Sequence, residues 1–121
     1  MVKDPRINLH DISRFAREIF SFADGVDYVS FAADPLRVRA VSYCLLAIGE
    51  AVFRLERDFP GFLLKEVSPD VPWTQIIGTR NFLAHGYDRI DPGTLWQVIG
   101  TDLGPLLSAV ESALLQLPDP E

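Results

Sequence analysis

The sequence DPLRVRAVSYCLLAIGEAVFRLERDF, residues 34–59, has the pattern of one long amphipathic helix. Apolar side chains recur in it at steps of three and four residues, which is the spacing of one helix face. They are Leu36, Ala40, Val41, Cys44, Leu45, Ile48, Val52 and Leu55. Asp34 and Pro35 make a favourable N-cap and first turn, and the pattern ends before Pro60. The stretch therefore predicts a helix that begins at Pro35 and stops before Pro60.

A second helical pattern precedes this helix, and a loop follows it. Between Arg6 and Phe22 the apolar residues again recur at three- and four-residue steps, and that helix is expected to end near Asp24-Gly25. Residues 59–72 hold three prolines and one glycine. This composition predicts a loop with room for one short helical turn.

Two more helices are predicted in the second half of the chain. Pro72 opens the first, whose apolar residues continue to Ala84, and Gly86 is expected to be its left-handed C-terminal cap. The second begins around Asp91-Pro92 and stops at Pro118. Three residues inside it favour a kink: Gly100, Gly104 and Pro105.

These patterns define an all-α fold. No segment has the sustained two-residue alternation of a strand, and the sequence has neither an Asn-Gly hairpin turn nor an internal repeat. We expect an antiparallel four-helix bundle with room for one short extra helix, in a single domain over residues 1–121. The long helix also has apolar residues on a second face, with Val41 counted on both: Val38, Val41, Leu46 and Phe53. A second apolar face suggests a homodimer, although a thick four-helix core could also absorb it.

Composition narrows the class of protein. No apolar run is long enough to span a bilayer, and the N-terminus lacks the pattern of a secretory signal, so we expect a cytoplasmic protein with no membrane partner. The net charge of −6 disfavours non-specific coating of DNA, so any contact with nucleic acid needs a local arginine cluster. The single cysteine, Cys44, has apolar neighbours and is expected to be buried rather than reactive.

Chemistry, if any, is concentrated in RNFLAHGY, residues 80–87. Arg80 offers a fork of donors that suits a phosphate, and His85 can accept and return a proton near neutral pH. On an ideal helix the two are separated by about 140° and about 7.5 Å, so they do not project in parallel. A flexible arginine, or a loosened final turn at Gly86, could make them converge. Asn81 lies on the same helix face as His85, where its amide could orient the imidazole or hold a ligand oxygen.

Arginine and histidine together are a minimal set for cleaving RNA, which supplies its own nucleophile in the 2′-hydroxyl. One histidine is too few for two proton transfers, but a two-fold dimer would bring two to one groove. Near a helix C-terminus, the same residues could instead complement the helix dipole and its free carbonyls. The two histidines, His10 and His85, lie far apart in the chain without clustered carboxylates, so no metal site is expected.

These residues resemble the signature of the HEPN superfamily, in which an arginine and a polar residue precede a histidine after a short spacer. The fuller form Arg-x4-His-x-Tyr, completed here by Tyr87, is similar to that of the HepT toxins. The likeness covers almost the entire chain. It includes Phe31, Asp34, residues 47–51, Pro72-Trp73, Ile77-Gly78, Arg80-Asn81, Ile90-Asp91, Leu95-Trp96, Asp102-Leu103 and Pro105-Leu106.

The resemblance implies a homodimeric toxin, a metal-independent endoribonuclease without a cofactor, with Arg80 and His85 of both subunits lining the cleft. Its implied partner is a minimal nucleotidyltransferase antitoxin that modifies Tyr87 with AMP. Glu50 matches a family position and could pair with Arg80, orient His85 or be a solvated residue. The alternatives are a non-catalytic helical subunit that binds a nucleotide or the nucleotidyltransferase, with Arg80 as phosphate anchor, and a purely structural dimeric bundle.

Overall fold

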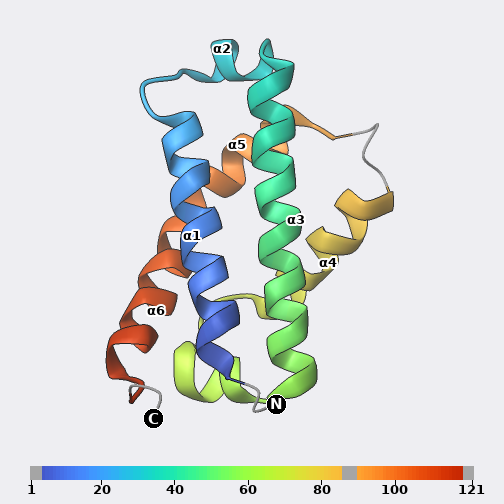
Figure 1. The fold of residues 1–121 in the computed structure, drawn as a ribbon. Helices are drawn as coiled ribbons and strands as arrows, with labels where there is room; N and C mark the ends of the chain where they lie inside the picture. The colour runs from blue at the N-terminus through green and yellow to red at the C-terminus, as the bar shows by residue number, and fades with distance from the viewer. Residues whose placement is uncertain (1–3, 86–89, 119–121) are drawn as a thin grey trace.

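The computed structural model describes residues 4–85 and 90–118, which are helical with short connections (Figure 1). The helices are α1 (Pro5–Ala23), α2 (Tyr28–Ala32), α3 (Pro35–Asp58), the π-helical turn η1 (Leu63–Val67), α4 (Trp73–His85), α5 (Pro92–Thr101) and α6 (Leu103–Gln116). None of the residues in these two ranges forms a strand. The all-α prediction is confirmed.

α3 and α5 begin where the sequence signals predicted. Asp34 caps α3, because its carboxylate accepts hydrogen bonds from the backbone N–H groups of Leu36 (3.1 Å) and Arg37 (3.3 Å). These bonds, with the backbone bond from Arg37 foremost, hold the pKa of Asp34 below its ordinary value. Asp4 and Asp91 cap α1 and α5 in the same way, each followed by a proline.

The helices are arranged as an antiparallel bundle (Figure 1). α1 and α3 pack side by side, α6 lies against α1, and α4 lies against the other side of α3. The chain runs up α1, down α3, up α4 and down through α5 and α6. The predicted four-helix order is therefore confirmed.

The last predicted helix is two helices rather than one. α5 and α6 meet at Asp102 with a bend of 46°, between the Gly100 and the Gly104-Pro105 that favoured a kink. No single helix among the described residues is long and apolar enough to cross a membrane. Only α5 and α6 taken together, across their bend, reach that length and composition.

Two short elements complete the fold. The turn η1 occupies the predicted loop, as the single helical turn expected there. The five-residue helix α2 was not predicted, because a segment this short shows no helical period. It contributes Phe31, whose fully buried ring lies 5.1 Å from that of Trp96 in α5.

The core lies between α1, α3 and α6, and it includes some of the α3 residues that were expected on the second face of that helix. Val41 is fully buried within one protomer, so the expectation that it belongs to a second, outer face is wrong. Val38 and Leu46 are half-buried and pack against the same core. Phe53 is half-buried outside this core, beneath arginine side chains.

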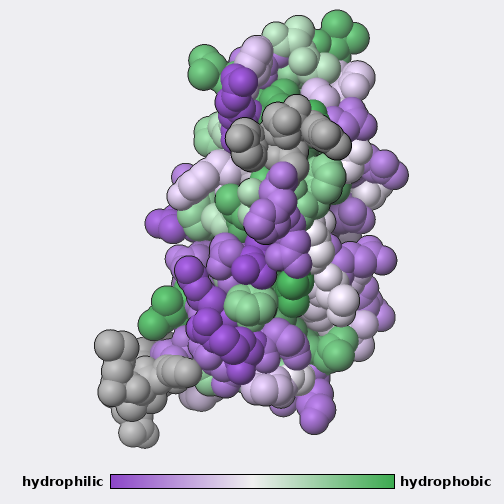
Figure 2. All heavy atoms as spheres, turned by 90° about the vertical axis from the view of Figure 1, so that its right-hand side faces the viewer, coloured by the Kyte–Doolittle hydropathy of each residue, from purple (hydrophilic) through white to green (hydrophobic). Residues whose placement is uncertain are grey.

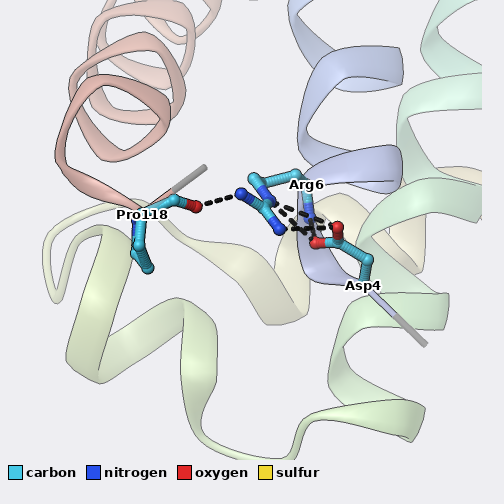
Figure 3. Close-up of polar contacts among 3 residues, drawn as sticks. All are labelled: Asp4, Arg6 and Pro118. Atoms are coloured by element: carbon cyan, nitrogen blue, oxygen red, sulfur yellow. Dashed lines mark hydrogen bonds and ion pairs between the residues drawn. The ribbon is translucent and has the colours of Figure 1, made fainter. Parts of the chain in front are cut away.

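The two ends of the described chain are tied together at one end of the bundle. Arg6, in the first turn of α1, donates to the carboxylate of Asp4 through Nε (3.0 Å) and Nη2 (2.8 Å). Its Nη1 donates to the backbone carbonyl of Pro118, just beyond α6 (Figure 3). The bridge closes the bundle at the end opposite α2.

Candidate active site

The helix that carries the candidate residues is anchored firmly at its first turn. Trp73 is buried, and its indole N–H donates to the backbone carbonyl of Ser68 over 2.9 Å. Further along α4, Leu83 is also buried, whereas Asn81, Phe82 and His85 around it are exposed. The last turns of α4 therefore touch the protomer along one face only.

A glycine allows α4 to cross α3 at very short range. A methyl group built on Gly49 collides with the Cβ of Arg80 and lies 3.2 Å from the Cα of that residue. It also lies 3.3 Å from the backbone oxygen of Ile76. Gly49 is buried in the interior of α3, where glycine is unfavourable for a helix, so the close approach explains its presence.

Arg80 is held against α3 by two side chains of that helix, Glu50 and Phe53. Its Nε donates to the Glu50 carboxylate, which forms an ion pair with it. Its guanidinium carbon lies 4.3 Å from the centre of the Phe53 ring, within the range of a cation–π contact. Of the roles considered for Glu50, pairing with Arg80 is the one observed. Among the described residues Arg80 donates to no carbonyl of α4, so it does not cap that helix there.

Phe53 joins Arg80 to a second arginine. The guanidinium of Arg57 lies 5.9 Å from the same ring, and it donates to Asp58 through Nε (2.9 Å) and Nη2 (3.2 Å). The two arginines on either side of Phe53 are each paired with a carboxylate, Arg80 with Glu50 and Arg57 with Asp58. Figure 2 shows the α3–α4 side of the molecule, where hydrophilic side chains run along much of its length.

His85 and Asn81 lie apart from these two arginines. Both are exposed, and their side chains have no hydrogen-bond or ion-pair partner among residues 4–85 and 90–118. α4 remains α-helical through His85, so its last described turn is not loosened to bring His85 round to Arg80. Within one protomer the two candidate catalytic residues are therefore not brought together. Tyr87 and the predicted cap Gly86 lie outside the described residues.

Cys44 is buried, as predicted. It is 3% exposed, and burial together with the nearby Glu18 carboxylate raises the pKa of its thiol to about 11. A protonated, enclosed thiol is a poor nucleophile, so Cys44 is a packing residue of α3.

Comparison with known proteins assigns the family. The family model described as "Ribonuclease HepT-like" matches residues 12–113, which include the whole of α3 and α4. The chain belongs to the HepT-like ribonuclease family. This agrees with the HEPN resemblance found from the segment that contains Arg80 and His85.

Relatives in other organisms agree with this family assignment. A protein named as a candidate RNase in Methanocaldococcus jannaschii is 33% identical over 109 residues, covering 90% of this chain and 95% of the relative. One named likewise in Caldanaerobacter subterraneus is 30% identical over 113 residues, covering 93% and 96%. One named as a candidate ribonuclease HepT in Thermococcus cleftensis is 29% identical over 103 residues, covering 85% and 89%. No solved structure gives a significant match to the chain.

Sequence reasoning missed Gly49 and Phe53 as parts of the site. A glycine in the middle of a strongly helical pattern was the available signal for Gly49, because such a residue usually marks a close backbone approach. Phe53 was expected to lie outside the main apolar face of α3, but nothing in the sequence connects it with Arg80. Its partner Arg80 is 27 positions away, and only the packing of α4 on α3 brings them together.

Proposed function

We propose that the chain is a toxin ribonuclease that cleaves RNA in a cleft shared by two protomers. The observation that carries the proposal is that Arg80 of α4 is held against α3, while His85 lies on the exposed side of α4. One protomer thus offers a phosphate ligand and a proton-transfer group in different directions. A second protomer related by two-fold symmetry would bring its own Arg80 and His85 to the cleft, so that one cleft would hold both kinds of group from both protomers.

The chemistry needs two proton transfers and a site for negative charge. One His85 imidazole takes the proton of the ribose 2′-hydroxyl, whose oxygen attacks the adjacent phosphorus. The bond from phosphorus to the 5′-oxygen breaks, and the partner's His85 protonates that oxygen as it leaves. The products are a 2′,3′-cyclic phosphate and a 5′-hydroxyl. Arg80 neutralises the phosphate oxygens, and Asn81 is suited to hold a substrate oxygen beside His85, so no step requires a metal ion.

The exposed side of α4 is suited to the protomer contact. Phe82 is 56% exposed, although it is a large aromatic residue in the middle of the candidate segment. Exposed aromatic residues next to polar ones are typical of protein–protein contacts. A homodimer formed through this side of α4 would cover Phe82 and bring the neighbouring Asn81 and His85 towards their symmetry mates.

A nucleotidyltransferase antitoxin is the proposed partner, with Tyr87 as the residue it modifies. Tyr87 follows His85 by two positions, so an attached AMP would add negative charge and bulk beside the RNA phosphate. We expect mass increments of AMP after incubation with ATP and the partner. They should be absent in Tyr87→Phe and unchanged in Tyr43→Phe, a control at an exposed tyrosine of α3. Modification that persists in Tyr87→Phe would reject the site.

Growth on induction without the partner tests the toxin function. Wild type should arrest growth, whereas Arg80→Ala and His85→Ala should not, with all proteins folded and expressed at equal levels. Arg14→Ala and His10→Ala are matched controls, because both residues are exposed on α1 and should leave the arrest intact. Equal growth of wild type and the site variants would favour the non-catalytic binding subunit instead.

A further inference from the structure

We infer that Glu50 and Phe53 are positioning residues that orient Arg80, so that its two terminal nitrogens, and not its Nε, meet the RNA phosphate. The inference rests on the proposed function for the identity of the anion. Its geometric part, a fixed arginine, stands independently of whether RNA is cut.

The contacts of Arg80 restrain its side chain at successive points. Gly49 sets the position of its Cα and Cβ, because no larger residue would allow α4 so close. Glu50 then fixes Nε, and the Phe53 ring supports the face of the guanidinium at 4.3 Å. The Arg80 side chain is 23% exposed, so it is restrained without being sealed from solvent.

The hydrogen bond to Glu50 uses one donor of Arg80 and leaves the others for a ligand. A guanidinium has five N–H donors in one plane, one on Nε and four on the terminal nitrogens. Glu50 occupies the Nε donor, and no other acceptor among the described residues bonds to Arg80. The terminal nitrogens are left as a pair suited to two parallel bonds with one phosphate.

Restraint of this kind lowers the entropic cost of the contact with the phosphate. A free arginine loses side-chain entropy when it grips a phosphate, and a pre-oriented one has lost it already. The opposite role for Glu50 would be to mask Arg80 by neutralising its charge. The two roles predict opposite results when the carboxylate is removed.

The kinetic test compares Glu50→Ala, Glu50→Gln and Phe53→Leu on a short RNA. Glutamine keeps an oxygen that can accept from Nε, so it should retain kcat within about threefold of wild type, whereas alanine should lower kcat by about tenfold or more. Phe53→Leu keeps the apolar bulk without the ring and should fall between them. Glu66→Ala, at an exposed carboxylate of η1, should leave kcat unchanged. Unchanged or raised activity in Glu50→Ala would overturn the positioning role and indicate masking.

A second measurement distinguishes failure of this inference from failure of the proposed function. In nitrogen-15 NMR spectra, the Nε–H signal of Arg80, identified by its loss in Arg80→Lys, should be rigid and slow to exchange in wild type and Glu50→Gln. It should be lost to exchange in Glu50→Ala. A rigid signal in a protein without ribonuclease activity would leave the orienting contact intact and reject the RNA chemistry alone. An equally mobile signal in wild type and Glu50→Ala would reject the orienting contact itself.

Discussion

Replacing Gly49 by alanine tests whether the α3–α4 crossing is as close as the structure has it. The added methyl group would meet the Cβ and Cα of Arg80 and the backbone oxygen of Ile76. Two of these three atoms belong to the backbone of α4, which can move only as a unit. Overpacking of this kind costs about 1–3 kcal/mol, and we expect the upper end. Alanine also favours the helix by about 1 kcal/mol. The net loss in the free energy of unfolding should therefore be about 2 kcal/mol.

A control in the neighbouring helix separates packing from helix propensity. A methyl group added to Gly78 of α4 meets nothing within 4 Å, so Gly78→Ala should raise the free energy of unfolding by up to about 1 kcal/mol. Urea unfolding followed by circular dichroism, at one fixed protein concentration, measures both variants. Gly49→Ala unfolding at the same urea concentration as Gly78→Ala, or a higher one, would refute the close crossing.

Three further predictions concern the interface, the thiol and a helix cap. Phe82→Asp should shift the proposed dimer to monomer in sedimentation, whereas Leu115→Asp, at an exposed position of α6, should not; an unchanged mass in Phe82→Asp would reject that interface. With the thiol pKa of Cys44 at about 11, roughly one molecule in a thousand is thiolate at pH 8, so iodoacetamide should label only unfolded protein. Because the pKa of Asp34 is lowered in the folded protein, its cap stabilises the fold above pH 3.8 and does so less as the pH falls further. The loss in the free energy of unfolding caused by Asp34→Ala should therefore be smaller in acid. A loss that stays the same at all pH values would contradict this.

The main helices could be predicted because each has both a period and an end signal. α3 combines a long apolar face with an aspartate-proline start, and the structure begins and ends it where those residues indicate. The break between α5 and α6 was only partly visible, since the apolar period continues across it and Gly100, Gly104 and Pro105 indicated a kink, not two helices. Val41 was misplaced because the second face of α3 is covered within the protomer, and helical spacing cannot show which neighbour covers a face.

The candidate site was found from the sequence, but its construction was not. Arg80 and His85 stand out because an arginine and a scarce histidine share one short segment. The contacts that hold Arg80 depend on α4 crossing α3 at Gly49, which is a tertiary feature. Local spacing did predict that Arg80 and His85 diverge on one helix, and the proposed shared site rests on this divergence.

Metal-independent RNA cleavage at Arg80 and His85 can be measured with the purified chain in the presence of EDTA, with analysis of the fragment ends. Wild type should give fragments with 2′,3′-cyclic phosphate and 5′-hydroxyl ends, and Arg80→Ala or His85→Ala should leave the RNA intact. Fragments with 3′-hydroxyl ends, or equal cleavage by wild type and both variants, would contradict this chemistry.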